Sequence, residues 1–337
     1  MSICAPPAAD EVVAAFGLSG TAGTLHGVAG AWSNRLFRLR VGTESFAVKE
    51  MMNPWGESRW MDWLAEAWGF ERRAIAAGVA APEPIPNPAD GACFAVVGRE
   101  RGAGEAVVRV HRWTEGSPAP LGPASDALAR WSGETLALMH GLRERPGRRE
   151  VFPVLNIDSA SRWASLTDAA ERASTPWAHL MHVASPCVAA IADLAVEAGH
   201  RRDEEVMTHG DVDQKNIVVN AAGPYLCDWD VAGPLVPRRE VADAAMSMAR
   251  WERFDIASEV VRSYRSAGGE LEELTTADLG QPMMTGIDWI VLNVERALRI
   301  RSVSDAEAAL GSRLVPDLLR RLPYQLHIAE RIQELLK

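Results

Sequence analysis

Residues 209–216 read HGDVDQKN, and residues 228–230 read DWD. Between these two stretches lie two short runs rich in β-branched and aromatic residues, IVVN at 217–220 and YLC at 225–227. The turn residues AAGP at 221–224 separate them, so the whole segment predicts a β-hairpin. Such a hairpin presents Asp211 and Asn216 at its entry and Asp228 at its exit. Three oxygen-bearing side chains should therefore surround one point.

The spacing of these side chains indicates phosphoryl-transfer chemistry. Asp211 and Asn216 stand in a D-x-x-x-x-N register, in which a carboxylate accepts the proton of a substrate hydroxyl and an amide helps to hold magnesium. Asp228 falls where the second magnesium ligand belongs. An Asp that caps a turn would explain HGD alone, but it would not explain the joined pattern.

The joined pattern resembles the aminoglycoside phosphotransferase family of small-molecule kinases. Protein kinases carry Arg between the His and the Asp, end in D-F-G and have a later A-P-E, none of which occurs here. The resemblance implies an α+β, two-lobed protein-kinase-like fold with an antiparallel-sheet N-lobe and a mostly helical C-lobe. We expect the nucleotide-binding N-lobe over residues 1–113, and the C-lobe with catalytic loop and acceptor pocket over residues 114–337.

Composition sets outer bounds on this interpretation. The chain has 337 residues, 47% of them apolar and 24% charged, which suits a two-lobed globular protein. The net charge of −10 argues against a nucleic-acid partner and suits a cationic substrate. Its four cysteines form no C-x-x-C pair, so neither a disulfide framework nor a zinc site is predicted. We see no signal peptide or membrane-length apolar run, and expect a cytoplasmic monomer or homodimer with no membrane partner.

The resemblance also implies a phosphate-binding lysine, which is predicted on a strand at 45–50. This strand and one at 35–41 flank the turn GTE at 42–44. Alternation along a strand places Ala47 and Lys49 on one face. The resemblance implies that Ala47 lies beneath adenine and that Lys49 contacts the α- and β-phosphates. A solvated lysine at a strand end is the alternative for this segment taken alone.

The segments flanking these strands supply two further nucleotide contacts by resemblance. Ser33 lies in a loop at 24–34 rich in small residues, where it could donate to the phosphates, although a plain turn fits equally well. Trp113 ends a strand predicted at 106–113, at the position of the hinge between the lobes, where backbone groups pair with adenine.

A kinase lysine requires a glutamate from the next helix, predicted at about 58–77. Glu66 falls on a polar stripe and Glu71 on the apolar stripe. Because a carboxylate directed at the core needs a cation there, we expect Glu71 to pair with Lys49.

The C-terminal half is predicted to be mostly helical, and in resembling proteins its last helices wall the acceptor pocket. His209 should brace the catalytic loop through hydrogen bonds. His179 and His182 could form a metal pair, but no third ligand is evident and a solvated helix face is favoured. Five carboxylates are candidates to contact a cationic acceptor, each with a structural or surface role as the alternative: Asp213, Asp230, Glu252, Asp288 and Glu295.

These features together imply a kinase that uses ATP and Mg²⁺ to phosphorylate a hydroxyl of a small molecule. The partners are then a nucleoside triphosphate and a hydroxylated acceptor, which we expect to be a cationic antibiotic such as an aminoglycoside or a cyclic peptide. A metabolite kinase acting on choline, homoserine or an amino sugar is the alternative. A nucleotide-binding pseudokinase is a second alternative, which loss of Lys49, Asp211, Asn216 or Asp228 would have signalled.

Overall fold

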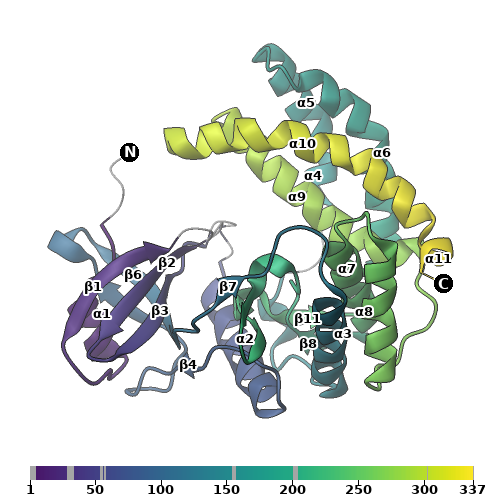
Figure 1. The fold of residues 1–337 in the computed structure, drawn as a ribbon. Helices are drawn as coiled ribbons and strands as arrows, with labels where there is room; N and C mark the ends of the chain where they lie inside the picture. Colours follow the sequence, from purple (N-terminus) through teal and green to yellow (C-terminus); the bar gives the residue numbers. More distant parts are fainter. Residues whose placement is uncertain are drawn as a thin grey trace.

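An antiparallel sheet dominates the N-terminal part of the protein, in a computed structural model that describes residues 5–28, 34–53, 56, 58–153, 157–199, 204–301 and 303–336. The sheet lies at the left of Figure 1. Its order is β1-β2-β3-β6-β4, with β5 also paired to β6. The strands are β1 (Ala22–Val28), β2 (Arg35–Val41), β3 (Glu44–Glu50), β4 (Pro84–Ile85), β5 (Ala95–Gly98) and β6 (Glu105–Arg112).

Alternation along the strands gives this sheet one apolar face and one charged face. Phe37, Leu39 and Val48 are buried in a cluster that also holds Val12 of helix α1 (Ala9–Ala15). The opposite face is set by the register between β3 and β6, in which Lys49 is paired with Arg109 and Ala47 with His111. The charged face of the sheet therefore brings two cations side by side.

The loop expected at 24–34 is wrong in part, because β1 occupies Ala22–Val28 and pairs with β2. Gly23 and Gly27 lower the strand propensity of this segment, which hid it from sequence analysis. Backbone hydrogen bonds to β2 hold this segment in a strand even though its side chains do not favour one. The remaining residues of the loop fall mostly outside the described ranges.

Helix α2 (Trp60–Ala76) connects the sheet to the rest of the protein. It contacts the short 3₁₀ helix η5 (Trp229–Val231) and strand β11 (Gly233–Leu235) of the C-terminal part. As expected from the apolar stripe, Glu71 is buried together with Leu64, Ala67 and Ala74. One face of α2 therefore packs against η5 and β11, which follow the predicted catalytic segment.

Helices form most of the C-terminal part, at the right of Figure 1. Helix α3 packs on α8, α7 packs on α8, and α10 packs on both α9 and α6. The helices are α3 (Asp126–Gly141), α4 (Asp158–Ser161), α5 (Trp163–Arg172), α6 (Ala178–Ala198), α7 (Pro237–Ala249), α8 (Phe254–Ser266), α9 (Gly280–Ala297), α10 (Asp305–Glu330) and α11 (Ile332–Leu335). Short 3₁₀ helices are η1 (Glu100–Gly102), η2 (Arg149–Val151), η4 (Gln214–Asn216) and η6 (Thr276–Leu279).

Helix α6 corrects one expectation, since it is long and apolar enough, by length and composition alone, to cross a membrane. Core helices of water-soluble folds can share both properties. In this fold Met181, Val188 and Ile191 are buried, and the helix packs against α5, α9 and α10. One third of this apolar stretch is buried inside the structure, and Val183 and Val196 are exposed, so only part of its apolar content serves packing between helices.

The predicted hairpin is present, as β9 (Ile217–Asn220) and β10 (Gly223–Leu226). Strand β7 (Ser117–Pro118) pairs with the other side of β9, which leaves β10 at an edge. Pro224, expected in the turn, instead pairs with Val219 inside the strand, where an edge tolerates the missing N–H. Strand β8 (Val206–Thr208) pairs with β11 and leads into residues 209–216.

Close packing of α3 on α8 gives a test of this architecture. A Cβ at Gly133 would lie 2.4 Å from the carbonyl oxygen of Val260 and 2.8 Å from the amide nitrogen of Tyr264. Overpacking of this kind typically costs about 1–3 kcal/mol, which exceeds the roughly 1 kcal/mol that alanine gains in helix propensity. We expect Gly133→Ala to lower the thermal unfolding midpoint. Gly141→Ala on the same helix, where no atom lies within 4 Å of the new Cβ, should not lower it. Equal midpoints for the two variants would contradict this packing.

Candidate active site

In the loop between β8 and β9, hydrogen bonds to both carboxylate oxygens hold the side chain of Asp211. The side-chain amide of Asn216 donates to the Asp211 carbonyl oxygen and to Oδ2, both at 2.9 Å. The ammonium of Lys215 donates to Oδ1 at 3.0 Å. Asp213 caps η4 by accepting a hydrogen bond from the amide of Lys215 at 3.0 Å. The D-x-x-x-x-N spacing therefore corresponds to a direct contact between its two ends.

His209 braces this loop, as expected. Its Nε2 lies 2.9 Å from the carbonyl oxygen of Cys227, and the amide of Asp211 donates to its Nδ1 at 3.2 Å. These partners require the tautomer with hydrogen on Nε2. The ring also meets Trp229 edge-on, with 4.8 Å between centroids. One buried imidazole thus ties the Asp211 loop to the DWD segment.

Glu240 of α7 stabilises the same loop through hydrogen bonds, a role that the sequence did not predict. Its buried carboxylate accepts hydrogen bonds from the amide of Gly210 at 2.6 Å and from the hydroxyl of Thr208. His140 Nε2 lies 2.7 Å from the same carboxylate, and its Nδ1 lies 3.0 Å from the Tyr264 hydroxyl. Burial alone would raise the pKa of Glu240, but the hydrogen bond and charge of His140 lower it. The carboxylate therefore stays available as an acceptor for the loop.

Asn216 and Asp228, the predicted metal ligands, are brought together by the hairpin. The amide of Cys227 donates to the carbonyl oxygen of Asn216 at 2.7 Å, which places the residue before Asp228 against Asn216. Because the NH₂ group of Asn216 is bound to Asp211, its Oδ1 remains as the atom that can bind a metal ion. An amide oxygen and a carboxylate form the oxygen donor set that Mg²⁺ prefers, so these residues fit that ion.

The His179 and His182 pair does not form a metal centre in the described part of the chain. His182 Nε2 instead lies 2.6 Å from Glu171, and both side chains are exposed. No group of three or more His, Cys, Asp or Glu side chains in that part is arranged to hold a metal ion.

Lys49 lies within the predicted site, with its ammonium paired to the carboxylates of both Asp228 and Asp230. Burial alone would lower the pKa of Lys49, but the charges of Asp228 and then Asp230 outweigh it and raise the pKa. Ala47 is half-buried on the same strand face. The strand therefore places a permanent cation beside the DWD segment.

The expected pair between Glu71 and Lys49 is wrong, although Glu71 is buried as predicted. Glu71 Oε2 accepts a hydrogen bond from Arg109 Nη2 at 2.6 Å, and its Oε1 lies 2.9 Å from His111 Nε2. Burial would raise the pKa of Glu71, but Arg109 and then His111 lower it. Arg109 displaces Lys49 because register places it on the same sheet face, nearer to α2. Glu66 behaves as expected for the polar stripe and pairs with exposed Arg148 at 3.1 Å.

Asp230 also departs from its predicted role as an acceptor contact. Its carboxylate is buried and binds both Arg109 and Lys49. Burial would raise the pKa of Asp230, but the charges of Lys49 and Arg109 lower it. Because both carboxylate oxygens are occupied by cations of the protein, Asp230 has a structural role.

Two predicted nucleotide contacts remain predictions. Ser33 lies outside the described residues. The amide of Trp113 donates to the carbonyl of Ser45 at 3.0 Å, and Arg38 lies over its indole, 4.6 Å from the ring centroid. Any backbone contact from Trp113 to adenine would therefore have to use its carbonyl oxygen.

The three acceptor candidates on the later helices differ in their surroundings. Glu295 is buried and pairs with Arg162 and with Arg301, the latter at 2.7 Å, so its expected role in holding an ammonium ligand is wrong. Glu252 is exposed just beyond α7. Asp288 is half-buried on α9, where burial, against a hydrogen bond from Ser159, raises its pKa. These two carboxylates remain predicted acceptor contacts.

Asp243 is a further carboxylate at the catalytic loop that sequence analysis did not select. It lies on α7, one turn beyond Glu240, and interacts electrostatically with Asp211, Lys215 and Asp213. Burial, followed by the negative charge of Asp211, raises the pKa of Asp243 to about 7. The one sequence feature that could have pointed to Asp243 is its position on a core helix, three residues after Glu240.

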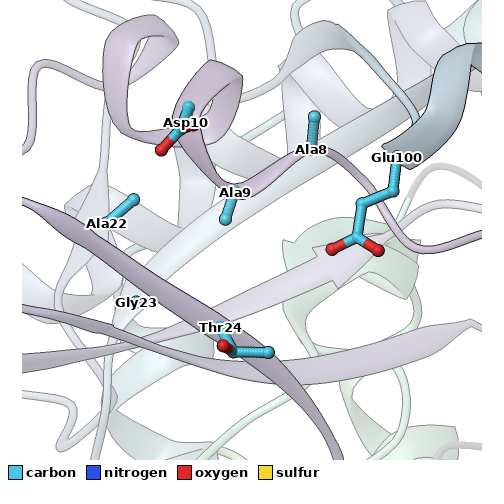
Figure 2. Close-up of a pocket in the computed structure, with 7 residues that line it drawn as sticks. All are labelled: Ala8, Ala9, Asp10, Ala22, Gly23, Thr24 and Glu100. Atoms are coloured by element: carbon cyan, nitrogen blue, oxygen red, sulfur yellow. The ribbon is translucent and has the colours of Figure 1, made fainter.

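A surface hollow of about 360 Å³ lies elsewhere, between α1, β1 and η1. Figure 2 shows the residues that line it: Ala8, Ala9, Asp10, Ala22, Gly23, Thr24 and Glu100. None of the predicted site residues lines this hollow, so it is not the acceptor site considered above.

Comparison with known proteins gives one family match. A family model described as phosphotransferase enzyme family matches residues 24–274. No curated protein matches the chain significantly.

Solved structures with the same fold include three small-molecule kinases. A spectinomycin phosphotransferase solved with ADP and spectinomycin has a TM-score of 0.68 at 12% identity, covering 95% of this chain and 97% of that chain. An amicoumacin kinase solved with AMP-PNP and Ca²⁺ has a TM-score of 0.61 at 14% identity, covering 89% and 88%. A choline/ethanolamine kinase family protein from Mesorhizobium loti has a TM-score of 0.51 at 19% identity, covering 96% and 99%. At these identities the likeness establishes the α+β, kinase-like fold.

The raised pKa of Asp243 predicts a pH dependence of stability. The folded protein holds this proton up to about pH 7, whereas the unfolded chain releases it near pH 3.8. The fold therefore loses stability as pH rises through this window. We expect Asp243→Asn to raise the thermal unfolding midpoint relative to wild type, and to do so more at pH 8 than at pH 5. Asp317→Asn, which alters an exposed carboxylate on α10, should show no such difference. An equal gain for Asp243→Asn at both pH values would contradict the burial of a proton-binding carboxyl here.

Proposed function

The chain belongs to the phosphotransferase enzyme family, and from this membership we propose that it transfers the γ-phosphoryl group of ATP to a hydroxyl of a small molecule. That it is a small-molecule phosphotransferase follows from the family. The observation that carries the finer proposal is the fixed carboxylate of Asp211. It stands at one end of a hairpin whose other end presents Asp228 beside Lys49.

In this proposal Asp211 orients the acceptor hydroxyl and takes its proton. Phosphoryl transfer passes through a largely dissociative transition state, so the proton leaves late and orientation supplies much of the effect. The hydrogen bonds from Asn216 and Lys215 hold the carboxylate in one orientation for that purpose. A hydroxyl oxygen would need to approach within about 3 Å of it.

The phosphates would be held from the opposite side by the positive charge of Lys49. Asn216 Oδ1 and the Asp228 carboxylate would hold Mg²⁺, which supplies charge neutralisation for the phosphate oxygens. Lys49 now pairs with Asp228, and phosphate oxygens offer it an alternative negative partner. The relatives solved with ADP or with AMP-PNP support a nucleotide as the donor.

For the acceptor we favour a cationic, polyhydroxylated antibiotic of the aminoglycoside or cyclic peptide type. The ammonium of Lys215 interacts with the carboxylates of Asp211 and Asp213 and with the carboxyl of Asp243, whose pKa is about 7, and the chain as a whole carries a charge of −10. Excess negative charge around the base favours an acceptor that brings its own ammonium group. The structural likeness to spectinomycin and amicoumacin kinases supports the same choice.

A metabolite kinase is the second candidate, since choline is also a cation that carries a hydroxyl. The likeness to a choline/ethanolamine kinase family protein supports it at a lower TM-score, 0.51. The pseudokinase alternative has less support, because Lys49, Asp211, Asn216 and Asp228 are all present.

Replacement of the base gives the direct test of the mechanism. Asp211→Asn keeps the size of the side chain but cannot accept the proton, so we expect kcat to fall by about 10²–10⁴. Affinity for ATP should change little, because Lys49 and the hinge remain. Steady-state kinetics and calorimetric titration with the nucleotide measure the two effects separately. A variant that keeps full kcat would remove Asp211 from this role.

An acceptor panel separates the function classes. Wild-type protein with ATP and Mg²⁺ should release ADP with one or more cationic antibiotics and more slowly with choline, homoserine and amino sugars. Chelation of Mg²⁺ with EDTA should stop the reaction, because the phosphate charges then lack their counterion. Turnover confined to the metabolites would select the metabolite kinase. Nucleotide binding without product from any acceptor would select the pseudokinase.

A further inference from the structure

Arg109 is a fully buried guanidinium at the centre of the nucleotide-binding half of the site. Its side chain is 1% exposed, and it stands on β6 in register with Lys49 on β3. A charge buried this deeply is tolerated only when carboxylates surround it. Nη2 binds Glu71 of α2 at 2.6 Å, and Nη1 binds Asp230 of η5.

The two carboxylates bound by Arg109 differ in their second partners. The other oxygen of Glu71 is occupied by His111 at 2.9 Å, so Glu71 has no oxygen left for Lys49. The other oxygen of Asp230 binds Lys49. Charges therefore alternate from α2 through β6 and η5 to β3, in the order Glu71, Arg109, Asp230 and Lys49.

We propose that Arg109 is a positioning residue, which couples the carboxylate of helix α2 to the phosphate-binding Lys49 through Asp230. This inference rests on the proposed function, because it assumes that Lys49 binds nucleotide phosphates. A planar guanidinium carries fixed N–H donors on both Nη atoms and can bind a different carboxylate through each, whereas an ammonium is a compact point charge. Arg109 can therefore hold Glu71 and Asp230 at fixed separation.

This arrangement also explains how Lys49 can keep its place when Asp228 is needed for the metal. Lys49 has two carboxylate partners, and only Asp228 is at the position of a metal ligand. Asp230 is also paired with Arg109, so it could remain the partner of Lys49 if Asp228 bound the metal ion. The relay thus holds the ammonium during nucleotide binding.

The competing explanation is that the ion pair between Arg109 and Glu71 only stabilises the fold. Measuring the affinity for a nucleotide distinguishes this explanation from a positioning role. We use Arg109→Lys, which keeps the charge, and Glu71→Gln, which keeps the volume, so that neither leaves an unpaired buried guanidinium. Arg112→Lys, on the same strand with exposed partners Glu44 and Glu83, and Glu66→Gln, on the same helix, are the matched controls. Affinity for AMP-PNP with Mg²⁺ is measured by calorimetry, together with KM for ATP and for the acceptor.

We expect Arg109→Lys and Glu71→Gln each to weaken AMP-PNP binding by about ten-fold and to raise KM for ATP, leaving KM for the acceptor unchanged. The double variant should be no weaker than about the worse single variant, because both changes interrupt one relay. The control variants should bind like wild type.

Two results would overturn the inference while the proposed function stands. One is wild-type AMP-PNP affinity in both single variants, which would make the pair purely structural. The other is fully additive losses in the double variant, which would mean that Glu71 acts independently of Arg109. Failure of the wild-type protein to bind AMP-PNP with Mg²⁺ would instead overturn the proposed function.

Discussion

The burial of one guanidinium, that of Arg109, constrains the arrangement around the sheet face that carries Lys49. A permanent cation cannot lose its hydration without carboxylates beside it, so α2 and η5 must each direct one toward β6. That requirement fixes helix α2 against the sheet on one side and against the DWD segment on the other. The position of Lys49 depends on the same set of charges, since Asp230 is shared between the two cations.

The catalytic loop is held by a second set of buried polar groups. Glu240 accepts from Thr208 and Gly210 on one side of the loop, while His209 joins the other side to Cys227 and Trp229. Gly210 has a φ of +83° and lies close to the Val231 carbonyl, so a side chain at this position would be strained. Because Glu240, His209 and Trp229 are buried, these contacts hold the loop in one conformation without a substrate.

Charge is distributed unevenly across the site. Beside the sheet, the two cations Lys49 and Arg109 pair with three carboxylates, those of Glu71, Asp228 and Asp230. At the loop that carries Asp211, the ammonium of Lys215 interacts with the carboxyl groups of Asp211, Asp213 and Asp243. Burial, followed by the negative charge of Asp211, raises the pKa of Asp243. A cationic acceptor would relieve the same repulsion, which links the electrostatics of the loop to the proposed substrate class.

The sequence by itself determined the features that depend on spacing along the chain. The strands around Lys49, the hairpin after Asn216 and the burial of Glu71 follow from local periodicity, and the HGD and DWD motifs indicated the family and fold. Tertiary structure alone decided which charges pair. Glu71 pairs with Arg109 and not with Lys49, because strand register brings Arg109 to the same sheet face. Glu295 pairs with Arg162 and Arg301 and not with a ligand, because helix packing brings these groups together from distant parts of the chain. The raised pKa of Asp243 could not be predicted for the same reason, because it depends on a fold that places Asp243 half-buried near Asp211.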